Sequence, residues 1–201
     1  MNSFYGDYLF ILQSALNNVL SDIELIRAWK KSCGYRDPVE HCKGRIKSEE
    51  SMIDKLKRKN MKPTLDNARS KIFDAVGVRI VCNFVDDVYE IRDIIKSLSS
   101  LQIIQEKDYI AAPKPNGYRS YHLIVKTRVN IPGRTLDVPA EIQIRTIAQD
   151  SWAALEHQLK YKQEIDNMEL LQKELKRCSD EMASTDLTMQ TVRQMINGEI
   201  K

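Results

Sequence analysis

The chain has 201 residues, a formal net charge of +3 and 42% hydrophobic residues, which are ordinary values for a globular protein with one main domain. This composition excludes collagen, a disordered tail and a disulfide scaffold. The longest apolar clusters are far shorter than the roughly 20 residues of a membrane span. The chain begins without a basic segment followed by an apolar one, so we expect a cytoplasmic protein with no membrane partner. The four cysteines are widely spaced, which favours reduced thiols over a zinc site.

Positive charge is concentrated in two segments. Residues 43–62 carry a net charge of +5 and residues 107–145 a net charge of +4, while the segments around them are acidic. Concentrated positive charge is typical of a protein that binds a polyanion, such as nucleotide phosphates or nucleic acid. Two solvated lysine-rich faces would give the same distribution, so charge alone leaves both interpretations open.

The first part of the chain has helical periodicity. Residues 4–32 carry apolar side chains at intervals of three and four, which predicts an amphipathic helix. Ser48, followed by two glutamates, predicts the capped start of a second helix that runs to about residue 60, before Pro63.

The remainder alternates between strand and helix patterns. In order, it predicts a strand over 72–84, a helix capped by Asp86 and Asp87, strands over 102–110, 118–129 and 138–145, and helical structure over 146–197. We therefore expect an α+β fold in which helices cover one face of a mixed or mostly antiparallel sheet.

The predicted strand over 140–145 alternates between apolar and polar residues. Because side chains alternate across a strand, Glu141, Gln143 and Arg145 would form a polar row on the face away from the core. Asp74, at the start of another strand, supplies a second carboxylate. One or two carboxylates together with substrate phosphates are a typical Mg²⁺ site. A solvated sheet face and a turn at the start of a strand would explain the same residues.

A polar loop over 114–122 surrounds Gly117, which permits a left-handed backbone conformation. Tyr118 at this loop could stack on a base, and Asn116 could bind the edge of the base. Arg45 lies before the Ser48 cap, where a helix N-terminus favours phosphate and a guanidinium can stack on adenine. For the loop over 114–122, the alternative is a hairpin-like loop with a half-buried tyrosine.

These motifs, taken together and in this order, resemble the synthetase domain of the RelA/SpoT-homologue superfamily and, by length, its small alarmone synthetases. The matching segments are GRIKSEESMIDKLK (44–57), DAVGVRI (74–80), KDYIAAPKPNGYRSYH (107–122) and EIQIRT (141–146), with WAALEH (152–157) in support. The resemblance covers roughly residues 40–162.

The resemblance implies a nucleotidyltransferase-like mixed sheet flanked by helices. It divides the chain into an N-terminal helical extension (1–42), the synthetase domain (43–162) and a C-terminal helical extension (163–201). It also implies transfer of the β,γ-pyrophosphate of ATP to the 3′-hydroxyl of GDP or GTP, which yields AMP and the alarmone ppGpp or pppGpp.

The same resemblance assigns roles to individual residues. Glu141 and Asp74 would be catalytic and hold Mg²⁺, with Glu141 also the base for the 3′-hydroxyl. ATP would be bound by Arg45, Lys47, Ser51, Lys55 and Arg79, with its adenine between the two arginines. GDP or GTP would be bound by Lys107, Lys114, Asn116, Tyr118, Arg119, His122 and Gln143. Arg145 is a less direct match.

The resemblance also carries expectations about assembly and regulation. The chain has three histidines and lacks the His/Asp hydrolase motifs of bifunctional relatives, so we expect no alarmone hydrolysis. Short relatives form homotetramers, for which a seam would come from Leu170, Leu171, Leu175, Met182, Leu187 and Met195, unless these residues form an internal core. No motif decides whether (p)ppGpp or single-stranded RNA binds as an allosteric ligand.

Two other functions fit parts of the sequence. A toxin-like relative would use the same ATP site to pyrophosphorylate the 3′ end of tRNA, although Asn116 and Tyr118 favour guanosine. A non-catalytic nucleotide- or RNA-binding module would use the basic segments alone, but it would not need both carboxylates.

Overall fold

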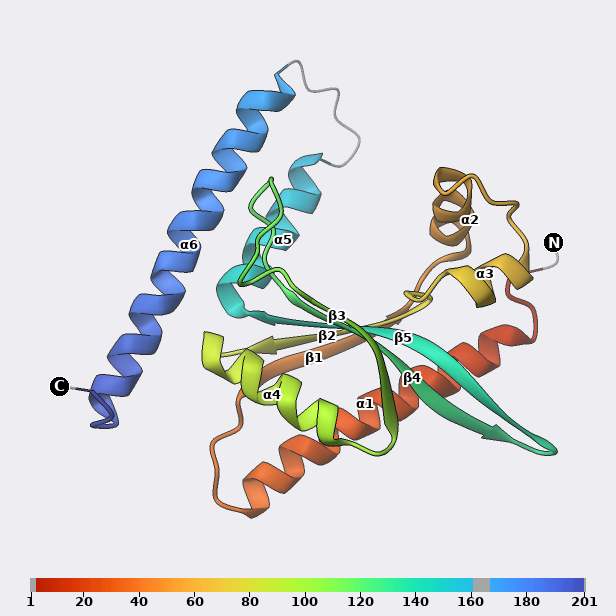
Figure 1. The fold of residues 1–201 in the computed structure, drawn as a ribbon, viewed down its shortest axis with the longest axis horizontal. Coiled ribbons are helices and arrows are strands. Elements are labelled where there is room, and N and C mark those ends of the chain that lie inside the picture. Colours follow the sequence, from red (N-terminus) through yellow and green to blue (C-terminus); the bar gives the residue numbers. More distant parts are fainter. Residues whose placement is uncertain (1–2, 161–166, 201) are drawn as a thin grey trace.

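A five-stranded mixed sheet forms the centre of the computed structural model, which describes residues 3–160 and 167–200 (Figure 1). The strand order is β1-β2-β5-β4-β3; β2 and β5 are parallel and the other neighbours antiparallel. The strands are β1 (Val39–Ile46), β2 (Val76–Cys82), β3 (Leu101–Asp108), β4 (Tyr121–Ile131) and β5 (Arg134–Thr146). The helices are α1 (Tyr8–Ser32), α2 (Glu49–Arg58), α3 (Leu65–Lys71), α4 (Val85–Ser97), α5 (Ile147–Lys160) and α6 (Met168–Ile196). The predicted α+β class, with terminal helices around a mixed sheet, is confirmed.

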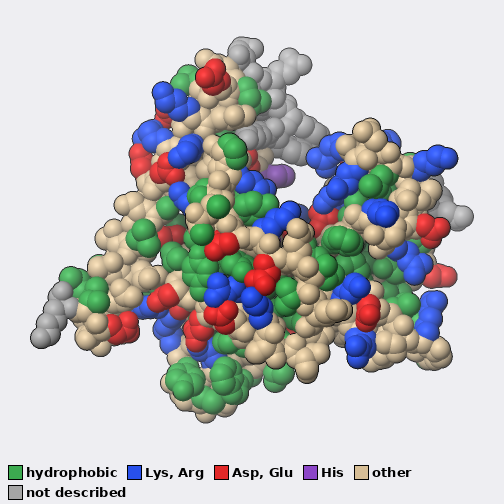
Figure 2. Space-filling model, in the orientation of Figure 1, with side chains coloured by type: hydrophobic (Ala, Val, Ile, Leu, Met, Phe, Trp, Pro, Cys, Tyr) green, Lys and Arg blue, Asp and Glu red, His purple; other side chains and the backbone are tan. Residues whose placement is uncertain are grey.

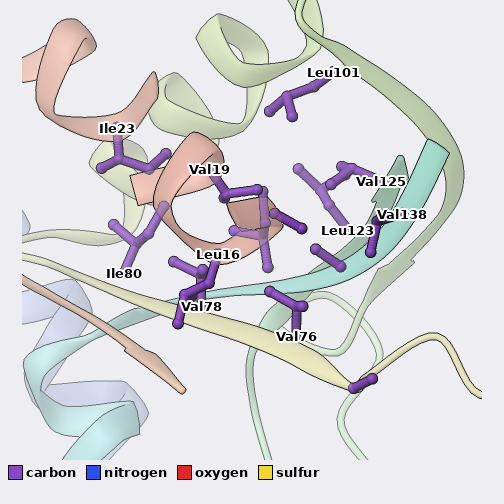
Figure 3. Close-up of a cluster of buried hydrophobic side chains, with 14 of the residues drawn as sticks. Leu16, Val19, Ile23, Val76, Val78, Ile80, Leu101, Leu123, Val125 and Val138 are labelled. Carbon is purple, nitrogen blue, oxygen red and sulfur yellow. The ribbon is translucent and has the colours of Figure 1, made fainter. Parts of the chain in front are cut away.

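The core lies between the sheet and the two helices α1 and α4, which cover one of its faces (Figure 1). Leu16, Val19 and Ile23 of α1 lie in one buried cluster with Val76, Val78 and Ile80 of β2 (Figure 3). Each fully buried aliphatic side chain of this kind contributes roughly 1.5–3 kcal/mol through the hydrophobic effect. On the opposite side of the sheet, α2 lies at one end and α5 at the other (Figure 1).

Among the described residues, α1 is the one helix long and apolar enough to span a membrane by length and composition. One face of α1, including Leu12, Ala15 and Ile23, is buried, whereas Phe10 and Leu25 on the other side are exposed. In this fold α1 is therefore a core helix.

Several predicted elements need correction. The sequence pattern missed β1, an edge strand whose outward residues are polar, and it missed the seven-residue helix α3. Helix α4 begins after Phe84, whose backbone N–H donates to Asp87, so Asp86 and Asp87 lie inside its first turn. The helical stretch over 146–197 is two helices, α5 and α6. The predicted boundary between 162 and 163 lies outside the described residues.

Helix α6 packs beside α5 (Figure 1). The Trp152 indole N–H of α5 donates to the Leu175 carbonyl of α6 at 2.9 Å, and Leu175 is buried. Of the residues expected to form a subunit seam, Leu175 therefore belongs to the internal core, whereas Leu170, Leu187 and Met195 are exposed. Their use in an oligomer stays a prediction.

Candidate active site

Two cavities open on the polar face of the sheet, and Glu141 of β5 lines both. The first, the β1–β2 cavity, has a volume of about 280 Å³ and is lined by Arg45, Lys47, Asp74 and Arg79 among others. The second, the β3–β4 cavity, has a volume of about 220 Å³ and is lined by Lys107, Lys114 and His122 among others. The two basic segments of the sequence therefore contribute to adjoining cavities that share one carboxylate.

The polar row predicted on β5 is present and hydrogen-bonded along its length. Arg145 donates to the Gln143 amide oxygen at 2.8 Å, and the Gln143 amide donates to Glu141 at 2.7 Å. His122, opposite Gln143 on β4, contacts the other Glu141 oxygen through Nδ1 at 3.2 Å. These contacts fix the Glu141 carboxylate at the junction of the two cavities.

The surroundings of Glu141 keep its carboxylate ionised. Burial raises its pKa, but hydrogen bonds from His122 and Gln143 and the nearby charges of His122 and Lys55 outweigh burial and lower the pKa to about 2. An ionised carboxylate accepts hydrogen bonds and binds cations, so Glu141 can orient a hydroxyl group or hold a metal ion at neutral pH.

In the β1–β2 cavity, the strand register sets the spacing of two arginines. Arg45 of β1 lies opposite Gly77 of β2, so Arg79 is its diagonal neighbour on the same face. Diagonal neighbours in an antiparallel pair are about 7–8 Å apart. A planar base stacked between two guanidinium groups needs a separation of about 7 Å, twice a contact distance of about 3.5 Å. The register therefore leaves room for one aromatic ring between Arg45 and Arg79.

Asp74 lies at the base of this cavity between two lysines. Its Oδ2 atom accepts from Lys55 at 2.5 Å and lies 3.2 Å from Lys47, while its Oδ1 atom is buried without a hydrogen-bond partner. The predicted cap of α2 explains how Lys55 reaches this place, because Ser48 accepts from the Ser51 backbone and starts the helix. Ser51 itself is exposed, and its hydroxyl bonds Ser48.

The donor atoms in this cavity fit a hard divalent cation. Asp74 Oδ1 is a buried, unpartnered carboxylate oxygen, and Glu141 lines the same cavity as a second ionised carboxylate. In the part of the chain that the structure describes, no cluster of three or more His, Cys, Asp or Glu residues could hold a metal ion. Two carboxylates suit Mg²⁺, which keeps several waters and takes its other ligands from substrate phosphates.

The β3–β4 cavity combines cations with aromatic rings. The Lys114 ammonium lies 4.6 Å from the ring centres of both Tyr109 and Tyr118. The Tyr118 hydroxyl accepts from Arg145 at 2.5 Å and lies 2.8 Å from His122 Nε2. Since His122 Nδ1 faces the Glu141 carboxylate, Nδ1 is the nitrogen that donates to Glu141.

The loop that carries Tyr118 is held from α6. Ser179 is buried, and its hydroxyl donates to the Gly117 carbonyl at 2.5 Å; Asp180 accepts from Arg119 at 2.8 Å. Gly117 has a φ of +91°, and a Cβ atom there would lie 2.7 Å from Ser179 Cβ. Close approach and positive φ together require glycine at this position.

Most of the predicted residues line the two cavities or contact a residue that does, but Ser51, Asn116 and Arg119 line neither. Arg119 pairs with Asp180 and lines a separate cavity against α5 and α6.

Sequence reasoning missed other residues that support the site. Tyr109 lies inside the quoted 107–122 segment, but nothing in the local sequence predicts the contact of its ring with Lys114. Glu156, which accepts from the Asn116 amide at 3.2 Å, lies inside WAALEH. Ser179 lies 62 residues from its partner Gly117, so no local signal could have identified it.

Charge is distributed as the two basic segments suggested. Figure 2 shows lysine and arginine side chains on both sides of a hollow between α2 and the α5–α6 pair. A larger hollow of about 380 Å³ lies between α1 and the end of β4, and its lining includes the uncharged Asn18, the acidic Asp22 and the basic Lys126. The convergent cations and carboxylates at Glu141 favour the two smaller cavities as the functional site.

The sequence matches the family described as "Region found in RelA / SpoT proteins" over residues 44–166. The match covers more than half of the chain, and the chain belongs to this family.

Two curated relatives come from Bacillus subtilis (strain 168). The chain is 44% identical to GTP pyrophosphokinase YwaC over 86% of this chain and 82% of the relative. It is 34% identical to GTP pyrophosphokinase YjbM over 82% of this chain and 74% of the relative.

Solved structures agree with these relatives. Small alarmone synthetase 1 from Bacillus subtilis, bound to its product pppGpp, superposes with a TM-score of 0.86 at 30% identity, over 95% of this chain and 97% of that one. Small alarmone synthetase 2 from the same organism superposes with a TM-score of 0.84 at 39% identity, over 94% and 97% of the two chains.

Proposed function

We propose that this chain transfers the β,γ-pyrophosphate of ATP to the 3′-hydroxyl of GDP or GTP and releases AMP and (p)ppGpp. The observation that carries the proposal is Glu141, which lines both cavities and so stands where a donor and an acceptor would meet. Curated relatives named GTP pyrophosphokinases and a similar synthetase solved with pppGpp support it.

ATP occupies the β1–β2 cavity in this proposal. The adenine stacks between Arg45 and Arg79, as their diagonal register allows. Lys47 and Lys55, with Ser51 at the start of α2, face the phosphates and offset their charge. A similar structure of small alarmone synthetase 1 bound to AMPCPP supports an adenine nucleotide as the donor.

The guanosine nucleotide occupies the β3–β4 cavity. Its base stacks on Tyr118 after displacing Lys114 from the ring, and Asn116 binds its edge. Lys107, Lys114, Arg119 and His122 face the acceptor phosphates and ribose, with Gln143 beside them. The basic side chains lower the repulsion between two highly charged nucleotides.

The reaction places the acceptor 3′-oxygen on the β-phosphorus of ATP. A bond forms between these atoms, the bond from the β-phosphorus to the oxygen of the α-phosphate breaks, and AMP leaves. Glu141 accepts the hydrogen bond of the 3′-hydroxyl and then its proton, which passes to solvent because the carboxyl pKa is low. Mg²⁺, held by Asp74 and Glu141, would neutralise charge on the transferred phosphates.

The test is a pyrophosphate-transfer assay with ATP, Mg²⁺ and one acceptor at a time: GDP, GTP or tRNA. We expect equal amounts of AMP and 3′-pyrophosphorylated guanosine nucleotide with GDP or GTP, and none when EDTA removes the metal. Transfer to tRNA alone would favour the toxin-like alternative. RNA binding without ATP turnover, weakening steeply with salt, would favour the binding module.

A tetramer assembled through the terminal helices, and allosteric binding of (p)ppGpp or single-stranded RNA, belong to the same proposal. The exposed apolar residues of α6, such as Leu187 and Met195, support a subunit contact. Light scattering of the purified chain measures the subunit number directly. Cytoplasmic location follows from the proposed substrates.

A further inference from the structure

Asp150, in the first turn of α5, forms ion pairs with two arginines of the candidate site. Its Oδ1 atom lies 3.1 Å from Arg145 Nη1 and 3.2 Å from Arg79 Nη1. The Asp150 side chain is 17% exposed, so these ion pairs are partly shielded from water. One carboxylate oxygen therefore contacts an arginine of the β1–β2 cavity and an arginine connected to the β3–β4 cavity.

On one side, Asp150 restrains Arg79. Burial lowers the pKa of Arg79 and the neighbouring charge of Arg145 lowers it further, whereas Asp150 raises it. The two guanidinium groups thus repel each other, and the carboxylate between them offsets this repulsion. Without that charge, Arg79 would gain by turning away from Arg145 and from the cavity wall.

On the other side, Asp150 restrains Arg145. The Arg145 guanidinium is buried and donates to the Tyr118 hydroxyl, to Gln143 and to Ser120. Tyr118 in turn contacts His122, which contacts Glu141. A change at Asp150 is therefore transmitted through a buried arginine to the ring that faces the acceptor.

The start of α5 does not need Asp150 as a cap. Thr146 and Gln149 form a reciprocal pair, in which the Gln149 backbone N–H donates to the Thr146 hydroxyl and the Thr146 backbone N–H donates to the Gln149 side chain. This is a capping box that satisfies the helix end by itself. The Asp150 carboxylate is thus free to bind the two arginines.

We propose that Asp150 is a positioning residue that holds Arg79 and Arg145 together, so that the ATP-binding and guanosine-binding cavities keep a fixed relative geometry. The assignment of the two cavities to donor and acceptor rests on the proposed function. The bridge itself is a contact between three described side chains.

The test substitutes Asp150→Asn, which keeps the shape and removes the charge. Equilibrium binding of AMPCPP, a non-hydrolysable ATP analogue, should weaken about tenfold, because each charge-assisted hydrogen bond to an arginine is lost or weakened. The KM for GDP should rise several-fold. Asp137→Asn is the matched control: its ion pair with Arg128 is exposed, and it should leave both values unchanged.

A double-mutant cycle separates positioning from a general effect on α5. In an Arg79→Ala background, adding Asp150→Asn should change AMPCPP affinity by less than about twofold, since Asp150 acts on ATP binding through the Arg79 side chain, which this background lacks. The rise in the KM for GDP should persist. Equal weakening of AMPCPP binding in both backgrounds, or unchanged binding in a folded Asp150→Asn chain, would overturn the proposal.

The binding measurement also separates this proposal from the proposed function. An unsubstituted chain that binds AMPCPP but transfers nothing to GDP or GTP would contradict the proposed function. The effect of Asp150 on AMPCPP affinity through Arg79 would still be measurable in that chain.

Discussion

The two halves of the site are built in different ways. The donor half, around the β1–β2 cavity, takes most of its side chains from residues 43–79, on strands and a capped helix, and Glu141 and Gln143 of β5 complete its lining. The acceptor half, residues 107–122, is largely loop, and Ser179 and Asp180 of α6 hold it from outside. The donor half is therefore set mainly by neighbouring elements, with Asp150 as a distant support of Arg79, whereas the acceptor loop depends on a contact across 62 residues of sequence.

This difference indicates where each nucleotide's affinity can be changed independently. Substitutions on α6 should alter the acceptor half and spare ATP. Substitutions at the residues the two halves share should affect both.

Glu141→Gln should have the largest effect, because both cavities share this residue. We expect turnover to fall by about a hundredfold or more, the range for loss of a residue that handles a proton in the transition state. Binding of AMPCPP in the presence of Mg²⁺ should also weaken, because Glu141 lines the ATP cavity and is one of the two proposed metal ligands. Turnover under saturating substrates, with thermal unfolding as a check on folding, measures this. A Glu141→Gln chain with normal turnover would remove Glu141 from the chemistry.

Gly117→Ala should separate the halves. The added Cβ would meet Ser179 at 2.7 Å in a left-handed backbone conformation, so α6 or the loop must move. We expect the KM for GDP to rise about tenfold, in keeping with strain of roughly 1–3 kcal/mol, and the KM for ATP to stay constant.

Gly133→Ala is the matched control for backbone strain. Gly133 also has a positive φ, +80°, but a Cβ atom at this position would have no neighbouring atom within 4 Å. It should lower stability without changing either KM. Equal rises in both KM values for Gly117→Ala would show that α6 supports the whole site.

Glu141 also predicts a pH effect on stability. Its pKa is lowered from an ordinary 4.5 to about 2, so its ionised form stabilises the fold above pH 4.5 and loses this contribution as the pH falls toward 2. When the pH falls from about 6 to about 3.5, the free energy of unfolding should decrease by about 1 kcal/mol more in the unsubstituted chain than in Glu141→Gln. Urea unfolding at the two pH values measures the difference. Parallel losses in both chains would show that Glu141 is not held ionised.

Asp180→Asn should have the smallest effect. Asp180 is exposed and also pairs with Lys176, and such surface pairs contribute about 0–1 kcal/mol. We expect a rise of about twofold in the KM for GDP that disappears in high salt, with ATP unaffected. An effect as large as that of Gly117→Ala would mean that Arg119, not the Gly117 contact, holds the loop.

The sequence predicted the buried face of the sheet and the start of α2 well. Alternation in β2 and β5 placed apolar side chains inward and Glu141, Gln143 and Arg145 together, because the period of a strand is a local property. Ser48 likewise marked the start of α2 by its own hydrogen bond.

Other features could not be read locally. Strand β1 is an edge strand with few apolar residues, so its periodicity is weak, although it carries Arg45. The bridge through Asp150 and the support from Ser179 depend on tertiary contacts between separate elements. Nothing in the spacing of residues within one element encodes such contacts.

A crystal structure of the chain with AMPCPP and GDP bound together would test the two-cavity arrangement most directly. We predict the adenine between Arg45 and Arg79, the guanine against Tyr118, and the GDP 3′-oxygen within hydrogen-bond reach of Glu141. Guanine in the β1–β2 cavity, or a 3′-oxygen remote from Glu141, would contradict the arrangement.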